Sequence, residues 1–320
     1  MTLRAGVIGM GVMGKHHCRV LSELEGVEFV GVLDPQVSQD SVAFPVFSDF
    51  DKFGLLDLDY CVVAAPTSLH HKIGIDLATL GIHALIEKPV AETVEQATLL
   101  EKAFAEAGLV GAVGHIERYN PAIVEMRKRV DNGLIGEVYQ IATRRQGPFP
   151  GRIADVGVVK DLATHDIHLA MWISSSTFKD FTGHMTHQAG RDYEDMLVAV
   201  GCLESGVITS HVVNWLSPFK ERLTIVTGER GTLVADTLNM DLAFHANGLH
   251  TSYWDQLATF RGVSVGDTVH YAIDRYEPLK LEHECFRDAV LEGTSRQIVT
   301  LPEGLEVLKV AQACIAENPT

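Results

Sequence analysis

The sequence predicts an α/β protein with two domains, a doubly wound parallel sheet followed by an α+β domain with a mostly antiparallel sheet. Two observations support this prediction. Across roughly the first third of the chain, short apolar runs alternate with helical patterns, as in β–α–β units of parallel sheets. After about residue 117, strand-like segments mostly follow one another directly, which is typical of antiparallel pairing. We place the domain boundary at this change of period, after residue 117.

The first domain contains strand-like runs separated by helical patterns. We expect strands at residues 5–8, 28–33, 60–64, 83–86 and 109–113, and helices at about residues 12–24, 69–80 and 93–107. Gly81 and Gly108 each follow a helix, at a position where a left-handed residue commonly ends it. Ligands of such sheets bind beyond the carboxyl ends of the strands, so residues 64–68 and 87–89 are expected to face a ligand.

The first strand runs into Gly9, Gly11 and Gly14, which have the G-x-G-x-x-G spacing of dinucleotide-binding turns. Gly9 allows the tight turn, Gly11 lets a pyrophosphate approach the backbone, and Gly14 lets the helix pack closely. Asp34 ends the second strand, where an acidic side chain accepts hydrogen bonds from the adenosine ribose. Asp34 would repel a 2′-phosphate and Pro35-Gln36 offers no arginine, so NAD is expected rather than NADP. A structural turn that binds no phosphate is the alternative.

The second domain consists of long alternating segments with few helices. A helix begins at Asn120-Pro121 and ends at Asn132-Gly133. The turn at residues 204–206 joins two strands as a hairpin. The other expected elements are strands at residues 138–145, 178–187, 197–203, 207–215, 223–227 and 232–236, and helices at about residues 161–172, 282–291 and 303–317.

Composition excludes several classes of partner. The net charge of −16, from 26 Lys and Arg against 42 Asp and Glu, argues against nucleic acid, whose backbone requires a basic footprint. No apolar run has membrane-spanning length, and the first residues do not resemble a signal peptide. The five cysteines are scattered and form no C-x-x-C pair. We therefore expect a cytoplasmic protein with no membrane partner, disulfide framework or cysteine zinc site.

Lys88 is the first residue with the chemistry of a catalytic group. It follows a strand end, and Pro89 restricts it to extended backbone. Beside a nicotinamide, its ammonium group can donate to a substrate hydroxyl and stabilise the developing alkoxide. An ordinary surface lysine is the alternative.

Asp161, His165 and His168 share one face of a predicted helix. Histidine is the usual general base near neutral pH, and a carboxylate four residues away can orient it. The alternatives are a surface ion pair, a buried structural histidine, and a metal site made from His165, His168 and either Asp161 or Asp166. Other histidines, among them His16, His17, His184 and His187, show no such partners in the sequence and are expected to be structural.

The glycine turn, Glu87-Lys88-Pro89 and Asp161-x-x-x-His165 together resemble the Gfo/Idh/MocA oxidoreductases, from residue 1 to beyond residue 300. The resemblance implies a Rossmann domain that binds NAD(P). It also implies a second domain whose large open sheet carries substrate on one side and a subunit interface, in a homodimer or homotetramer, on the other. It implies that Lys88 and His165 form the catalytic pair, with Asp161 positioning substrate or assisting His165. His165 would take the hydroxyl proton as hydride leaves the same carbon for the nicotinamide.

The chain departs from the common family pattern in two places. His168 stands where the family often has Asp, so its role is open. Ala65-Pro66-Thr67 stands where the family often has Thr-Pro-Asn, so contacts there are expected through backbone groups.

Residues 114–121 and 147–158 are similar to segments of UDP-N-acetylglucosamine 3-dehydrogenases. This narrower resemblance implies oxidation of a sugar hydroxyl to a ketone at C3 of a UDP-linked N-acetylhexosamine. Its pyrophosphate needs cationic donors, and the nearby candidates are Arg118, Arg144, Arg145 and Arg152. The alternatives are a dehydrogenase of a free sugar or an inositol-like cyclitol, and a non-catalytic NAD-binding sensor.

The expected site residues fall into three sets, with no metal. The catalytic residues are Lys88, Asp161 and His165. The cofactor-binding residues are Gly9, Met10, Gly11, Val12, Met13, Gly14, Asp34, Ala65, Pro66, Thr67, His70, Glu87 and Lys88. The substrate-binding residues are Lys88, Arg118, Tyr119, Arg152, Asp161 and His165. The NAD-binding domain spans residues 1–117, and the substrate-binding and oligomerisation domain spans residues 118–320.

Overall fold

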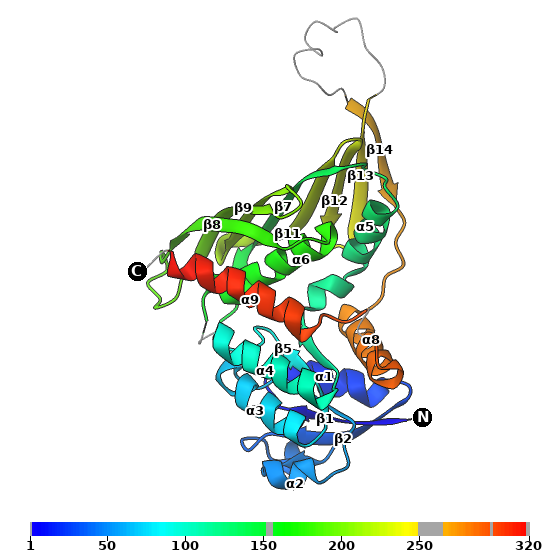
Figure 1. The fold of residues 1–320 in the computed structure, drawn as a ribbon, viewed down its shortest axis with the longest axis vertical. Coiled ribbons are helices and arrows are strands. Elements are labelled where there is room, and N and C mark those ends of the chain that lie inside the picture. Colours follow the sequence, from blue (N-terminus) through cyan, green and yellow to red (C-terminus); the bar gives the residue numbers. More distant parts are fainter. Residues whose placement is uncertain (1, 152–155, 249–264, 295–296, 318–320) are drawn as a thin grey trace, which may run out of the picture. The chain divides into compact units, whose positions relative to one another are not determined.

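The computed structural model describes residues 2–151, 156–248, 265–294 and 297–317. The chain divides into two compact units, Met1–Ile116 with Glu277–Gln312, and Glu117–Tyr276 with Ala313–Thr320 (Figure 1). The boundary expected after residue 117 lies one residue from the first division. Residues 277–312 differ from the expectation, because the sequence places them in the second domain and they belong to the first unit.

A parallel sheet of six strands forms the first unit, in the order β3-β2-β1-β4-β5-β6. The strands are β1 (Leu3–Ile8), β2 (Val27–Leu33), β3 (Val46–Phe47), β4 (Tyr60–Val63), β5 (His83–Glu87) and β6 (Gly111–Gly114). The strand order reverses between β1 and β4, which pair directly, and ligands of doubly wound sheets bind at this switch point. The predicted Rossmann sheet is confirmed.

The crossover helices begin and end close to the predicted residues. They are α1 (Val12–Glu23), α3 (Thr67–Thr79) and α4 (Val94–Ala107). Their apolar stripes, including Leu77, Leu100 and Phe104, are buried in the core of the sheet. Gly81 and Gly108 have φ values of +75° and +66°, as expected after a helix end.

Strand β3 and helix α2 (Phe50–Gly54) were not predicted, because neither is long enough to show a periodic pattern. The N-cap residue of α2 is Asp49, whose carboxylate accepts hydrogen bonds from the backbone N–H groups of Asp51 and Lys52. A short 3₁₀ turn, η1 (Gln39–Ser41), precedes β3.

The end of the chain returns to complete the first unit. Helix α8 (Pro278–Glu292) places Phe286 edge-on against Tyr60 of β4. Helix α9 (Leu301–Ala316) contributes Leu301, Leu305 and Leu308 to the same core as the sheet. Amphipathic periodicity predicts both helices but does not say which sheet their apolar faces cover, and this is why the sequence places them in the other domain.

The second unit is built on an eight-stranded sheet with the order β14-β13-β12-β11-β7-β10-β9-β8. Strands β7 and β10 pair in parallel, and the other pairs are antiparallel, as the sequence predicts for most of the sheet. The sequence did not predict β13 or β14. The strands are β7 (Val138–Pro148), β8 (Phe178–Thr186), β9 (Met196–Leu203), β10 (Ile208–Asn214), β11 (Leu216–Gly228), β12 (Gly231–Asp236), β13 (Asp241–Asn247) and β14 (Val265–Tyr271).

The two faces of this sheet differ. The 3₁₀ turn η2 (Ile116–Tyr119) leads into α5 (Pro121–Asp131), and a π-helical turn (Val159–Ala163) leads into α6 (Thr164–Ser174). Helices α5 and α6 pack their apolar residues on one face (Figure 1). On the other face, Val198, Val200 and Ile208 are 46%, 52% and 50% exposed. That face is open.

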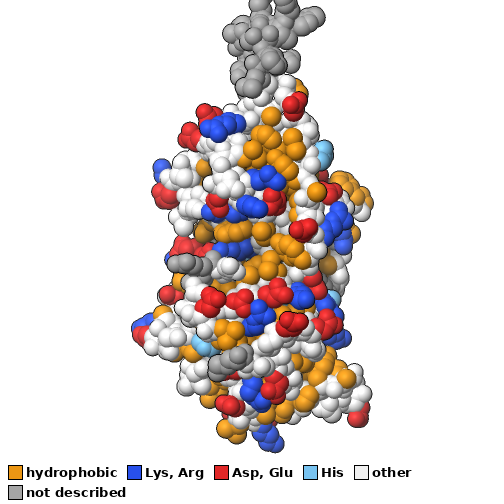
Figure 2. Space-filling view, turned by 90° about the vertical axis from the view of Figure 1, so that its right-hand side faces the viewer, with side chains coloured by type: hydrophobic (Ala, Val, Ile, Leu, Met, Phe, Trp, Pro, Cys, Tyr) orange, Lys and Arg blue, Asp and Glu red, His pale blue; other side chains and the backbone are white. Residues whose placement is uncertain are grey.

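Within the described residues, no helix is long and apolar enough to cross a membrane. On the face drawn in Figure 2, acidic and basic side chains are interspersed, and basic side chains form no continuous stripe.

Candidate active site

The glycine turn has the geometry that its spacing predicts. Gly9 has a φ of +93°, and a Cβ atom there would lie 2.7 Å from the carbonyl oxygen of Ala64 at the end of β4. A Cβ atom at Gly14 would collide with the carbonyl oxygen of Gly9. At Gly11, by contrast, a Cβ atom would meet nothing within 4 Å. Gly9 and Gly14 are therefore needed for the close packing of the backbone in this turn. Gly11 leaves space for a ligand to approach the backbone.

Asp34 ties this turn to the end of β2. Its Oδ2 accepts a hydrogen bond from the Met10 N–H at 2.8 Å, and its Oδ1 accepts one from the Gln36 N–H at 2.9 Å. Helix α1 has Gly11 as its N-cap residue, with no side-chain cap and no acidic residue in its first turn. Its N-terminal N–H groups can therefore bind an anion. These features fit the pyrophosphate and ribose of a dinucleotide.

His70 connects the segments that follow β4 and β5. Its side chain is buried, with Nδ1 2.9 Å from the Pro89 carbonyl oxygen and Nε2 2.9 Å from the Ala65 carbonyl oxygen. The ring therefore holds two strand ends in place, although we expected it among the cofactor-binding residues. Contact of Ala65, Pro66 and Thr67 with a cofactor stays a prediction, as does the direct contact of His70.

Glu87 lies at the end of β5 with its carboxylate directed to protein groups. Oε1 is 3.0 Å from His17 Nε2, and Oε2 accepts a hydrogen bond from the Lys88 N–H at 3.1 Å. Burial alone would raise the pKa of Glu87, but the His17 hydrogen bond and the charges of His17 and Lys88 bring its pKa below the ordinary value. The sequence indicated no partner for His17. Its ring is in fact fully buried against Glu87.

The other candidate catalytic residues lie in the second unit. Asp161 belongs to the π-helical turn, and His165 and His168 belong to α6. All three side chains are buried, at 3%, 8% and 2% exposure, which excludes the surface ion pair considered for them. Among the described residues, no group of His, Cys, Asp or Glu is arranged to hold a metal ion. A π-helical turn adds a residue to the helix, a feature that is frequent at functional sites.

Glu194 holds the start of this π-helical turn, and the sequence did not single it out. Its Oε1 accepts a hydrogen bond from the Val159 N–H at 3.1 Å, and its carbonyl oxygen accepts one from the Val158 N–H at 2.9 Å. Any Cβ atom at Gly157 would collide with the Glu194 carboxylate. Glu194 lies just before β9, outside any recognisable motif and 35 residues from Val159, so the sequence gives no signal of its role.

A buried ion-pair cluster connects α6 to the sheet. Arg145 on β7 donates from Nε to Asp166 Oδ1 and from Nη1 to Glu117 Oε1, both at 2.8 Å. Burial would raise the pKa of Glu117, but the charge and hydrogen bond of Arg145 keep it below the ordinary value. For Asp166, burial outweighs Arg145 and raises the pKa. The sequence did not predict this cluster, which fixes the helix residue next to His165.

The arginines expected at a substrate pyrophosphate have other contacts in the structure. Arg145 is committed to the cluster above, and the half-exposed Arg144 pairs with Glu221 at 3.1 Å. The guanidinium of Arg118 lies 4.9 Å from the centre of the Trp172 ring. Arg152 lies outside the described residues.

Tyr119, also expected to bind substrate, is 4% exposed. Lys88 and His165 lie in different units, so their action as a pair stays a prediction. The cofactor contacts of Met10, Val12 and Met13 are likewise predictions, although the turn that carries these residues has the expected form.

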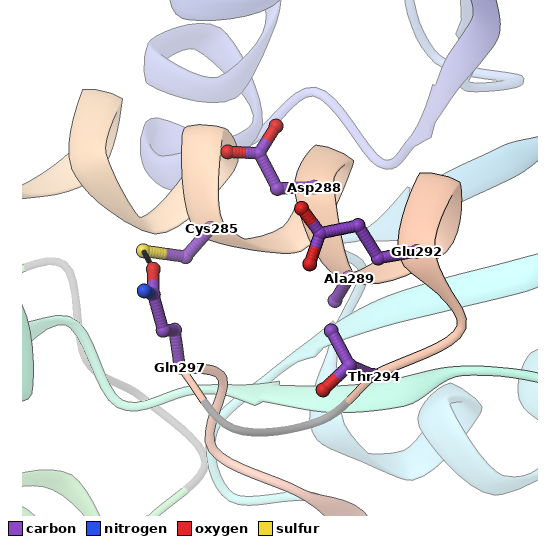
Figure 3. Close-up of a pocket in the computed structure, with 6 residues that line it drawn as sticks. All are labelled: Cys285, Asp288, Ala289, Glu292, Thr294 and Gln297. Carbon is purple, nitrogen blue, oxygen red and sulfur yellow. Dashed lines mark hydrogen bonds between the residues drawn. The ribbon is translucent and has the colours of Figure 1, made fainter.

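A separate pocket of about 470 Å³ lies beside the end of α8 (Figure 3). Its lining residues are Cys285, Asp288, Ala289, Glu292, Thr294 and Gln297. The Cys285 thiol contacts Gln297 Oε1 at 3.5 Å. None of the expected site residues lines this pocket, so it carries none of the chemistry proposed below.

Comparison with known proteins agrees with both units. Residues 3–115 match a family model described as an oxidoreductase family with an NAD-binding Rossmann fold. Residues 123–234 match the GFO/IDH/MocA C-terminal domain.

Two curated relatives are 29% identical to this chain. Inositol 2-dehydrogenase 2 of Saccharopolyspora erythraea aligns over 65% of this chain and 65% of its own length. UDP-N-acetylglucosamine 3-dehydrogenase of Acidithiobacillus ferrooxidans aligns over 65% of this chain and 66% of its own length. The chain thus spans just under two thirds of each relative in these alignments.

Solved structures show the same fold over the full chain. UDP-N-acetylglucosamine 3-dehydrogenase from Acidithiobacillus ferrooxidans has a TM-score of 0.86 at 24% identity, covering 99% of this chain and 98% of that chain. scyllo-Inositol dehydrogenase from Lactobacillus casei, solved with NAD(H) and scyllo-inositol, has a TM-score of 0.81 at 17% identity, covering 99% and 97%.

Proposed function

Since the chain belongs to the Gfo/Idh/MocA oxidoreductase family and its first unit is an NAD-binding Rossmann domain, we propose that it is an NAD-dependent dehydrogenase of a sugar or cyclitol hydroxyl. The reaction oxidises CH–OH to a ketone. Bound NAD supplies the hydride acceptor, and the protein supplies orientation and proton transfer.

The buried arrangement of Asp161 and His165 carries this proposal. Both side chains are shielded from bulk water, on a helix whose start is held by Glu194. A non-catalytic NAD-binding sensor needs no proton acceptor of this kind. The geometry therefore favours turnover over sensing.

Each catalytic residue has a separate task in the proposed reaction. His165 accepts the proton of the substrate hydroxyl, and Asp161 orients the substrate or the imidazole. Lys88 donates to the same oxygen and stabilises its developing negative charge. Asp34 accepts hydrogen bonds from the adenosine ribose and, through Met10, keeps the glycine turn in register.

For the substrate, we propose a UDP-linked N-acetylhexosamine oxidised at C3, in keeping with the similarity to UDP-N-acetylglucosamine 3-dehydrogenase. One observation favours a free cyclitol instead. Two of the candidate arginines already form ion pairs within the protein, Arg145 with Glu117 and Asp166, and Arg144 with Glu221. The similarity to inositol dehydrogenases points the same way.

We also propose that a second copy of the chain covers the open face of the larger sheet, forming a homodimer or homotetramer. The exposed aliphatic side chains of Val198, Val200 and Ile208 share that face, and monomers seldom leave such patches uncovered.

The five cysteines are all free thiols, which agrees with a reducing cytoplasm.

The direct test is NADH formation by the purified protein. UDP-N-acetylglucosamine, myo-inositol and glucose are offered separately, each with NAD and with NADP. NADH from the UDP-sugar alone supports the C3 assignment, whereas NADH from myo-inositol or glucose alone replaces it with a free sugar or cyclitol. No reduction with any of the three would favour the sensor. A higher rate with NADP than with NAD would contradict the role given to Asp34.

A further inference from the structure

A chain of buried ionisable side chains ends at the backbone of Lys88. His17 on α1 places Nδ1 2.8 Å from His283 Nε2 on α8 and Nε2 3.0 Å from Glu87 Oε1. Glu87 Oε2 accepts the Lys88 N–H at 3.1 Å. Both histidines are 0% exposed, so water does not compete for these hydrogen bonds. The chain joins α8, α1 and the strand end that carries Lys88.

The charges of the neighbouring groups make Glu87 the anion of this chain. Its pKa is lowered because the His17 hydrogen bond and the charges of His17 and Lys88 outweigh burial. Burial, followed by the charge of His17, lowers the pKa of His283 well below the ordinary value, which favours its neutral form. Burial and the charge of Glu87 raise the pKa of Glu282 well above the ordinary value, which likewise favours its neutral form. The carboxylate of Glu87 therefore accepts from both His17 and Lys88.

The Glu87 carboxylate is also confined by its surroundings. A Cβ atom at Gly114, the last residue of β6, would lie 3.2 Å from that carboxyl group. Glycine at this position leaves space for the carboxylate, and the contacts of Glu87 Oε1 with His17 and of Glu87 Oε2 with the Lys88 N–H hold its two oxygens. Helix α1 carries both His17 and, at its N-terminus, the glycine turn.

We propose that His17 and Glu87 are positioning residues for Lys88, coupling the dinucleotide-binding helix to the strand end that carries the catalytic lysine. His17 fixes the Glu87 carboxylate, and the carboxylate fixes the Lys88 peptide. This inference rests on the proposed function, in which Lys88 contacts the reacting hydroxyl.

His17→Phe removes both hydrogen bonds of His17 and leaves the buried Glu87 with only the Lys88 N–H as donor. His17→Gln keeps an N–H donor toward Glu87. His16→Phe is the matched control, because His16 is the exposed neighbour on the same helix.

Hydrogen exchange of the cofactor-free protein gives the first readout and requires no substrate. Since Pro89 has no N–H, peptides covering residues 87–89 report the Lys88 amide with little interference. We expect His17→Phe to raise its exchange rate about tenfold, the equivalent of one lost hydrogen bond, and His17→Gln to restore most of the protection. The His16→Phe variant should exchange like the wild type. Unchanged exchange in His17→Phe, or loss of NADH binding in both His17 variants, would overturn the proposal, the latter because it assigns His17 to folding.

Turnover gives the second readout. We expect His17→Phe to lower kcat about 100-fold, as for a reacting group displaced by about 1 Å, with unchanged NADH affinity. The acidic limb of its kcat profile should also move to higher pH, because burial raises the pKa of Glu87 once the hydrogen bond and charge of His17 are gone and only Lys88 opposes burial, with His283 and Glu282 as the other neighbours. A wild-type kcat and pH profile in a variant that binds NADH would contradict the proposal.

Lys88→Ala separates this inference from the proposed function. If Lys88→Ala keeps wild-type turnover, the catalytic assignment of Lys88 is wrong whatever the exchange data show. If Lys88→Ala is inactive and the His17 variants behave like wild type, the positioning role alone is wrong.

Discussion

Replacing Arg145 with methionine should destabilise the second unit strongly. Arg145 is 4% exposed and is the cation between Asp166 and Glu117, so Arg145→Met leaves two buried carboxylates without it. Breaking a buried pair in this way costs about 3–5 kcal/mol. Arg144→Met is the matched control, since Arg144 has a 51% exposed side chain and its pair with Glu221 contributes about 0–1 kcal/mol.

The assay is urea unfolding followed by tryptophan fluorescence. All three tryptophans fall within residues 117–276, so the signal reports the second unit. The direction in which stability changes with pH follows from the pKa shift of Glu117. In the wild type, the lowered pKa of Glu117 contributes stability above its unfolded pKa, and this is lost as pH falls. In Arg145→Met, burial raises the pKa of Glu117. The loss in free energy of unfolding relative to the wild type should therefore be largest at neutral pH and become smaller toward pH 5. A loss below about 1 kcal/mol at neutral pH, equal to that of Arg144→Met, would refute the reasoning.

Two further predictions use matched pairs. Burial lowers the pKa of His211 to about 4 from 6.5, so the unfolded chain binds more protons between these values. Stability should therefore fall by up to about 3 kcal/mol as pH drops from 6.5 to 4, and His211→Gln should remove this slope while the exposed His184→Gln keeps it. Gly11→Ala should keep wild-type stability but lower NAD affinity at least about tenfold, whereas Gly14→Ala should destabilise the first unit. Unfolding curves and NADH titration check this contrast, and equal NADH affinity in Gly11→Ala and wild type would contradict it.

The features that could be predicted from the sequence are set by local rules. The spacing of Gly9, Gly11 and Gly14 reflects steric limits that act within a few residues, and all three have the expected geometry. Helix boundaries such as Asn120 at the start of α5 and Gly108 at the end of α4 follow from capping chemistry. Asp34 was identifiable because its distance from the glycine turn is fixed by one β–α–β unit.

The features that could not be predicted depend on contacts between distant segments. Helix α8 and the start of α9 belong to the first unit because their apolar side chains pack against the parallel sheet, and the sequence of these helices does not indicate which sheet they cover. Arg145 forms an ion pair with Asp166, and Glu194 accepts a hydrogen bond from the Val159 N–H. Neither pair of residues belongs to a common sequence motif. His17 illustrates the same limit, because its partner His283 lies near the other end of the chain.

The most direct test of the catalytic account is a comparison of His165→Ala with the wild type in NADH binding and in single-turnover oxidation of the substrate identified above. The account predicts wild-type NADH affinity and a rate lowered about 10²–10⁴-fold, the usual contribution of a general base. Wild-type turnover in His165→Ala would contradict it, because proton transfer would then not depend on the buried imidazole.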